Sequence, residues 1–281
     1  MLSYPNYRVH APDGQLNVLQ ITDMHLLSPA STDNAEDHSD EKPNCRHCFE
    51  ANLAQALAED IRCDLILVTG DLVSKVDSVT YDHIFEVLHS TQIPFACIAG
   101  NHDVTDESRH DLPFEQRKLT ACATDPRLLS RHVIETDAWQ LLLLDSSIPG
   151  QIGGAVTEAD MDWLCAQLAT CDKPALLAVH HHVMPMYSEW IDAHMIENAD
   201  YFWQRLAPYA HLKVIVSGHT HQEQVRHCNG VTVYSTPSTC YQFMPYEDDF
   251  SYDKQAHAGY RWLQLANNGN LASWVKRLDT W

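Results

Sequence analysis

Short apolar runs alternate with amphipathic stretches along much of this chain. An apolar run of about four to eight residues bounded by turn-forming residues is typical of a buried strand. We predict strands at 16–22, 64–69, 94–99, 139–144, 175–179, 212–216, 231–235 and 260–265. Helical spacing occurs at 50–60, 81–88, 157–168 and 201–206. This alternation predicts an α/β fold in which many strands run parallel.

Two stretches lack such a pattern. Residues 26–44 are rich in Ser, Asp, Asn and Pro, which predicts a long polar loop that would suit a lid. Residues 105–136 are polar and match neither period. No repeat and no linker divides the chain, so we expect a single domain over residues 1–281.

The charge balance restricts the partners of the protein. The formal net charge is −20, from 38 acidic and 18 basic residues, and such a surface repels nucleic acid and anionic membranes. The first ten residues lack an apolar signal core, and no apolar run approaches the length of a membrane span. We therefore expect a cytoplasmic protein that binds neither nucleic acid nor membrane. Its oligomeric state is left open.

The cysteines show no framework spacing. Nine are present, and Cys63, Cys97 and Cys165 lie in apolar runs, where a reduced thiol packs as a small core residue. This distribution predicts a reducing compartment. Cys45 and Cys48 form a Cys-x-x-Cys pair without a second pair, so neither a zinc site nor a redox pair is expected there.

Metal-binding side chains follow the predicted strands where each strand ends. They are Asp23 and His25, Asp71, Asn101 and His102, His180, and His219 and His221. The carboxyl ends of parallel strands meet at one edge of a sheet, so these residues should converge. Gly100, just before Asn101, is expected to permit a sharp turn at the strand end.

The residue types suit a transition metal. Carboxylates, imidazoles and an amide without thiolate favour iron, manganese or zinc over calcium or copper(I). Asp-x-His and His-x-His each place two side chains on one side of an extended backbone. The set is too large for one catalytic ion, which favours two ions that share Asp71 at a spacing of about 3.5–4 Å. Each motif alone also fits an ordinary polar turn, and either His180 or His181 could be the ligand.

Taken in order, Asp-x-His, Gly-Asp, Gly-Asn-His-Asp, His and Gly-His-x-His resemble the motifs of the calcineurin-like metallophosphoesterases. Segments 180–182, 190–194, 237–243 and 259–262 further resemble the bacterial class III cyclic nucleotide phosphodiesterases. The resemblance implies a sandwich of mixed β-sheets flanked by helices, with a dinuclear metal site at the carboxyl ends of the strands. It also implies hydrolysis of 3′,5′-cyclic AMP to 5′-AMP in the cytoplasm by a hydroxide formed at that site.

The same resemblance implies a role for each residue. Asp23, His25 and His221 would hold one metal, Asn101, His180 and His219 the other, and Asp71 would bridge them. His102 would be the catalytic residue that is not a ligand. The substrate would contact His25, Asp71, Asn101, His102 and His221.

The match has one departure, and some roles stay open. Related enzymes often carry an Asp soon after Gly-Asp, where this chain has Ser74 and Lys75, so a carboxylate partner for His102 is in doubt. Asp103 could orient a histidine or fix the turn. The side chains of Thr239, Tyr241 and Phe243 could serve a base site, the core or an interface. Another small phosphoester as the substrate, or a non-catalytic scaffold, are the alternative functions.

Overall fold

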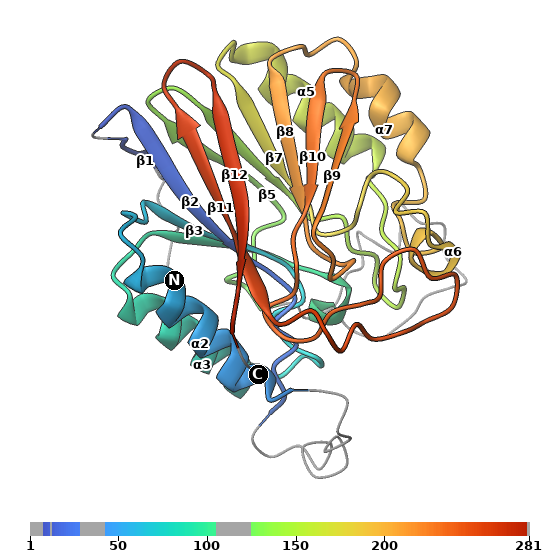
Figure 1. Ribbon diagram of the computed structural model, residues 1–281. Coiled ribbons are helices and arrows are strands. Elements are labelled where there is room, and N and C mark those ends of the chain that lie inside the picture. The colour runs from blue at the N-terminus through green and yellow to red at the C-terminus, as the bar shows by residue number, and fades with distance from the viewer. Residues whose placement is uncertain (1–7, 12, 29–42, 105–124, 280–281) are drawn as a thin grey trace.

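Two β-sheets pack face to face and carry helices on their outer faces in a computed structural model of the chain (Figure 1). The structure describes residues 8–11, 13–28, 43–104 and 125–279. The five-stranded sheet has the order β12–β11–β2–β3–β4 and contains β2 Gln15–Ile21, β3 Leu65–Thr69, β4 Phe95–Ile98, β11 Gly259–Ala266 and β12 Leu271–Arg277.

The seven-stranded sheet has the order β1–β5–β6–β7–β8–β10–β9. Its strands are β1 Arg8–Val9, β5 Arg131–Thr136, β6 Gln140–Leu144, β7 Ala175–Ala178, β8 Leu212–Ser217, β9 Gln224–Cys228 and β10 Val231–Ser235. Both sheets are mixed. Parallel pairing joins β2 to β3 and β3 to β4 in one sheet, and β6, β7, β8 and β10 in the other.

Alternate residues of the inner strands serve two different cores. Leu141 and Leu143 of β6 lie between the sheets, whereas Leu142 and Leu144 face the helices outside. A strand buried on both faces needs apolar residues at every position, not at every second one. This explains the continuous apolar runs of the sequence.

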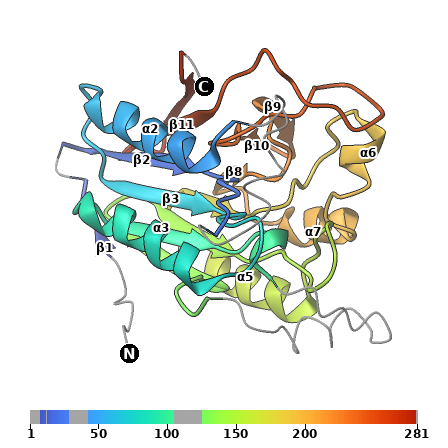
Figure 2. The same cartoon turned by 90° about the horizontal axis from the view of Figure 1, so that it is seen from below.

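Helices cover the outer face of each sheet (Figures 1 and 2). α2 Cys45–Ala58 and α3 Ser78–Ser90 pack on the five-stranded sheet, and α5 Glu158–Thr170 and α7 Ala199–Leu206 pack on the seven-stranded sheet. Short helical turns occur at η1 Asn101–Asp103 and α6 Glu189–Asp192. Thr157 caps α5 as expected, because its side chain accepts a hydrogen bond from the Asp160 amide.

The predicted fold class is confirmed, although several elements differ in detail. Each predicted strand is present. Four further strands, β1, β5, β9 and β12, were not predicted, because their partly exposed residues form no apolar run. α2 begins before the predicted residue 50, after its cap Asn44. Most of the 26–44 loop, and residues 105–124, lie outside the described residues. Within the described chain, no helix is both long and apolar enough to cross a bilayer.

One cysteine pairing differs from the expectation of reduced thiols. Cys45 forms a disulfide with Cys240, 195 positions away in the sequence. Cys48, its Cys-x-x-Cys neighbour, is a buried free thiol whose pKa is raised to about 11 by burial. Local spacing could not reveal this pairing, because the fold alone brings α2 beside the segment that contains Cys240.

Candidate metal centre

The metal-binding residues predicted from the sequence meet at one edge of the sandwich, where the two sheets adjoin. β2, β3 and β4 of one sheet deliver Asp23, His25, Asp71, Asn101 and His102. β7 and β8 of the other deliver His180, His219 and His221. Asp23, His25, Asp71, His180 and His221 are buried, whereas Asn101 and His219 are half-buried and His102 is exposed. Most of the candidate ligands are therefore buried, and the site is accessible to solvent on the side of His102.

Several of these side chains project from left-handed backbone. This corrects the expectation that Asp-x-His and His-x-His lie on an extended chain. Positive φ angles occur at Asp23 (53°), His25 (48°), Asp71 (50°), His219 (66°) and His221 (49°). Such angles are uncommon in residues other than glycine and cost about 1–3 kcal/mol each. They follow the strand ends, so the alternation of an extended strand does not apply to Asp-x-His or His-x-His. The surrounding fold holds several strained residues at one place, as is common at functional sites.

Two glycines allow backbone segments to approach these residues closely. Gly100 has a φ of −107° and is extended, so it does not provide the sharp turn expected of it. A Cβ atom there would instead collide with the Asp71 backbone and carboxylate. A Cβ atom on Gly218 would collide with Thr22 and lie 2.5 Å from an Asp23 carboxylate oxygen. Glycine is required at both positions for space, not for its conformational freedom.

Asp23, His25 and His221 form a first convergent group. The Nε2 atoms of His25 and His221 are 3.1 Å apart, and His221 Nε2 lies 3.3 Å from Asp23 Oδ1. His221 Nδ1 donates to the Tyr241 carbonyl at 2.8 Å, which fixes the tautomer with Nε2 free. The Asp23 carboxylate is held in turn by the His219 amide.

Asn101, His180 and His219 form a second group beside the first. Asn101 Oδ1 lies 3.2 Å from His180 Nε2 and 3.1 Å from His219 Nδ1. Asp71 stands between the groups, because its Oδ2 lies 3.6 Å from His25 Nε2 and 3.5 Å from His180 Nε2. Its carboxylate can therefore be shared by both.

The donor chemistry of both groups fits cations. His180 Nδ1 donates to the Thr69 carbonyl at 2.8 Å, so a neutral His180 ring turns its Nε2 lone pair toward the oxygens of Asn101 and Asp71. Facing lone pairs repel unless a positive charge lies between them. Burial lowers the pKa of His180, but the Asp71 carboxylate outweighs it and raises that pKa to about 9. The negative charge that raises this pKa also favours a metal cation at the same place.

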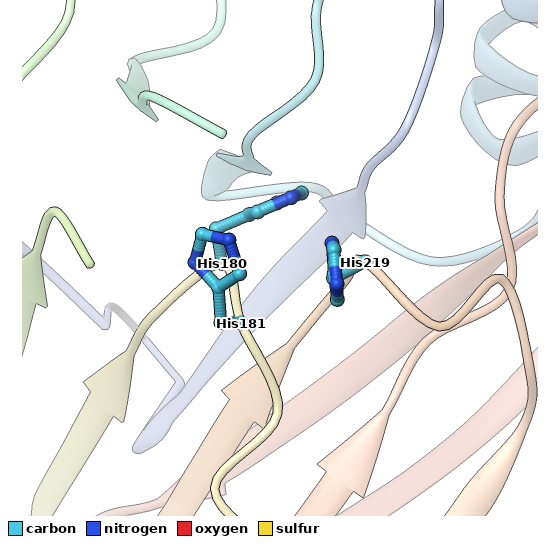
Figure 3. A group of neighbouring side chains, drawn as sticks. All are labelled: His180, His181 and His219. Carbon is cyan, nitrogen blue, oxygen red and sulfur yellow. The ribbon is translucent and has the colours of Figure 1, made fainter. Parts of the chain in front are cut away.

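His181 differs from His180 although the two residues are adjacent. Figure 3 shows both at the end of β7, with His219 at the end of the neighbouring strand β8. Both ring nitrogens of His181 already have partners, the Ser146 hydroxyl at 2.8 Å and the Ile152 carbonyl at 3.0 Å. Its ring lies 4.6 Å from the His219 ring, between centroids. His181 is placed to support the second group, whereas His180 leaves Nε2 free for a metal.

His102 lies at the open side of the first group. Its ring meets the His25 ring edge-on at 4.7 Å, and its Nδ1 donates to the Ser74 carbonyl at 2.9 Å. A backbone carbonyl therefore occupies the position for which the sequence offered no carboxylate. Desolvation by the surrounding walls lowers the pKa of His102, but the Asp71 carboxylate and the Ser74 carbonyl outweigh it and raise the pKa.

Asp103 fixes the turn that carries Asn101 and His102. Its carboxylate accepts hydrogen bonds from the Tyr81 hydroxyl at 2.7 Å, the Gly100 amide at 2.8 Å and the Leu72 amide at 3.2 Å. Burial, together with the nearby Asp71 charge, raises the pKa of Asp103 to about 7. Of the two roles left open by the sequence, these backbone and tyrosine partners support that of turn anchor.

A cleft of about 470 Å³ opens above the two groups. Sequence reasoning assigned no site role to several of its lining residues, namely Ile152, Trp190, Ile191, His194, Phe250 and Tyr252. Tyr241 and Phe243 also line it, whereas Thr239 is buried and donates to the Thr22 carbonyl at 3.2 Å. Two sequence signals pointed to this part of the cleft, namely the resemblance of segments 190–194 and 237–243 and the density of aromatic residues in segments 187–190 and 241–252.

The family model described as calcineurin-like phosphoesterase matches residues 16–223, a range that contains every candidate residue from Asp23 to His221. The chain belongs to this family. The resemblance inferred from the motifs is therefore confirmed, and this phosphoesterase has the sandwich of mixed sheets expected of it.

Relatives of this phosphoesterase carry more specific names. A probable cyclic nucleotide phosphodiesterase of Psychrobacter arcticus is 64% identical over 282 residues, covering 100% of both chains. The 3′,5′-cyclic adenosine monophosphate phosphodiesterase CpdA of Escherichia coli (strain K12) is 33% identical over 95% of this chain and 92% of its own.

Solved structures of low identity share the fold. A dimetal phosphatase from Danio rerio superposes with a TM-score of 0.59 at 12% identity, over 93% of this chain and 98% of its own. A purple acid phosphatase from yellow lupin superposes with a TM-score of 0.62 at 13% identity, over 94% of this chain and 54% of its own. At these identities the likeness concerns the fold alone.

Proposed function

We propose that this protein is a metal-dependent phosphodiesterase that hydrolyses 3′,5′-cyclic AMP to 5′-AMP. The observation that carries the proposal is the convergence of imidazole nitrogens and oxygens around Asp71, below an open cleft with His102 at its side. Two relatives of nearly full-length coverage, named for cyclic nucleotide hydrolysis, support the substrate class.

In this proposal the two groups hold two transition-metal ions. Asp23, His25 and His221 would hold the first ion, Asn101, His180 and His219 would hold the second, and Asp71 would be shared. The donor set suits iron, manganese or zinc. When bound, such ions neutralise phosphate charge and lower the pKa of water, so that hydroxide is available near neutral pH.

The remaining steps fall to side chains of the chain itself. Hydroxide, formed from water that has lost a proton to solvent, attacks phosphorus in line with the 3′ oxygen. A new P–O bond forms, and the bond to the 3′ oxygen breaks. His25, Asp71, Asn101, His102 and His221 surround the phosphate. Because Nδ1 of His102 is fixed on the Ser74 carbonyl, Nε2 is the atom that gives a proton to the leaving oxygen. General acid catalysis of this kind is worth about 10²–10⁴ in rate.

The setting of the activity is also part of the proposal. We place it in a single domain that spans residues 1–281, because both sheets contribute ligands to one centre. We place that domain in the cytoplasm, with the Cys45–Cys240 disulfide as an exception to the reduced thiols expected there. A net charge of −20 opposes binding of nucleic acid or anionic membrane.

Removal and return of the metal test the proposal. The protein is treated with a chelator, its metal content is measured, and turnover of cyclic AMP is followed after iron, manganese or zinc is added in turn. We expect activity to disappear and to return with at least one metal, at two ions per chain. Recovery with none would refute the dinuclear centre. Faster turnover of a phosphomonoester, a glycerophosphodiester or a dinucleotide than of cyclic AMP would refute cyclic AMP as the preferred substrate.

A further inference from the structure

Four aromatic side chains form one side of the cleft, and we refer to Trp190, Phe243, Phe250 and Tyr252 as the aromatic wall. Ring centroids lie 4.9 Å apart for Trp190 and Phe243, 5.1 Å for Trp190 and Phe250, and 4.9 Å for Phe250 and Tyr252. The four rings therefore touch as one cluster.

The backbone that carries the wall is tied together. Trp190 belongs to α6, and the other three rings belong to the loop before β11, which lies beside α6 in Figure 1. The Glu189 amide donates to Asp248 Oδ1 at 3.3 Å, and the Ser188 hydroxyl donates to the Glu247 carbonyl. An antiparallel bridge joins Phe243 to Tyr252. These bonds fix the wall in place before any ligand arrives.

The wall is continuous with the metal centre at one end and with solvent at the other. The Phe243 ring stacks on the His221 ring at 4.3 Å with an angle of 19° between the planes. At the outer end, Phe250 is 56% exposed although three aromatic rings contact it. A role only in the core does not explain a ring that packs at steep angles against three neighbours, lines the cleft and is still more than half exposed.

The chemistry of the lining indicates the ligand group that fits. Histidines aside, Asp71 is the single side chain that carries a charge near neutral pH among the described residues that line the cleft. It lies in the candidate metal centre. No lysine, arginine or second carboxylate among those residues lines the outer part, so that part does not suit a charged group. A flat, polarizable ring suits it, because stacking on an aromatic platform needs no specific hydrogen bond.

We infer that the aromatic wall binds the base of the nucleotide, with Phe250 as the stacking face. The inference rests on the proposed function, since a phosphate held at the centre directs its nucleoside along the cleft. Stacking of this kind changes binding by about 5- to 150-fold per base when the ring is removed. The base then contributes to substrate affinity and not to the chemical step.

Kinetics of Phe250→Ala on two substrates test the inference. One substrate is cyclic AMP, and the other is ribose 3′,5′-cyclic phosphate, which lacks the base. We expect KM for cyclic AMP to rise about 10-fold with kcat within about 2-fold, and no change for the base-free substrate. Phe250→Trp should restore KM. Equal losses on both substrates would show a structural role and would overturn the inference.

Tyr246→Ala is the matched control. Tyr246 lies in the same loop, is 62% exposed and does not line the cleft, so its loss should leave both substrates unaffected. A rise in KM equal to that of Phe250→Ala would mean that any truncation in the loop has the effect, and would overturn the inference.

Equilibrium binding separates this inference from the proposed function. Calorimetry compares 5′-AMP with ribose 5-phosphate on the metal-loaded protein. We expect 5′-AMP to bind about 10-fold more tightly, and Phe250→Ala to abolish the difference. Absent turnover of cyclic AMP by the unaltered protein would refute the proposed function. An unchanged preference for 5′-AMP in Phe250→Ala would refute the base site, whatever the turnover.

Discussion

The two sheets contribute different chemistry to the same centre. The five-stranded sheet supplies the oxygen donors Asp23, Asp71 and Asn101 with a single ligand imidazole, whereas the seven-stranded sheet supplies imidazoles alone. Each proposed ion has ligands from both sheets. The ions would therefore join two layers that also share an apolar core, and binding of metal should be coupled to the packing of the sheets.

Asp71→Asn should disrupt both halves of the centre together, because Asp71 is the one residue placed to contact both ions. We expect both metals to be lost and cyclic AMP turnover to fall by about 10⁴-fold or more, since the metals carry most of the rate acceleration. Metal analysis and steady-state kinetics measure the two effects. Retention of both metals by Asp71→Asn would show that Asp71 is not a shared ligand.

His102→Ala should separate catalysis from metal binding on the side of the five-stranded sheet. We expect kcat to fall about 10²–10⁴-fold, because the leaving oxygen loses its proton donor, with two metals retained. Turnover of a phosphodiester whose leaving group needs no proton, such as a nitrophenyl phosphodiester, should fall much less. Unchanged turnover of cyclic AMP would eliminate the assigned role.

His180→Ala and His181→Ala test the contribution of the seven-stranded sheet. His180→Ala should abolish binding of one ion, because it removes Nε2 beside Asn101 and Asp71. His181→Ala should lower the affinity for that ion by only about 10–100-fold, because His181 supports its neighbours and both of its ring nitrogens already have hydrogen-bond partners. Metal titration of each variant distinguishes them. The reverse order of effects would exchange the roles of the two histidines.

Cys45→Ser should have the smallest effect on activity. The disulfide ties α2 of the five-stranded sheet to the segment whose Tyr241 carbonyl orients His221. We expect turnover within about 3-fold and a Tm lower by roughly 5–10 °C under oxidising conditions. Cys228→Ser, which removes a free thiol of β9, is the control. Equal Tm values, or nine titratable thiols in the unreduced protein, would contradict the disulfide.

The fold class and the identity of the converging residues could be predicted from the sequence. Buried strands form continuous apolar runs, and ligand types at their carboxyl ends converge in any sheet with parallel neighbours. Asp23, Asp71 and His219 are recognisable as candidates by this rule, because each directly follows such a run or its glycine. These features depend on local composition and on one rule of topology, so the order of the amino acids is sufficient to predict them.

Other features depend on contacts between segments that are distant in the chain. The left-handed turns at Asp23 and His221 are held by the surrounding fold, and the modest preference of Asp and His for such angles is too weak to predict them. His180 and His181 have the same side chain in adjacent positions, and only their hydrogen-bond partners distinguish them. The Cys45–Cys240 bond and the aromatic wall likewise join remote segments. Such contacts arise from packing, and packing is a property of the folded molecule.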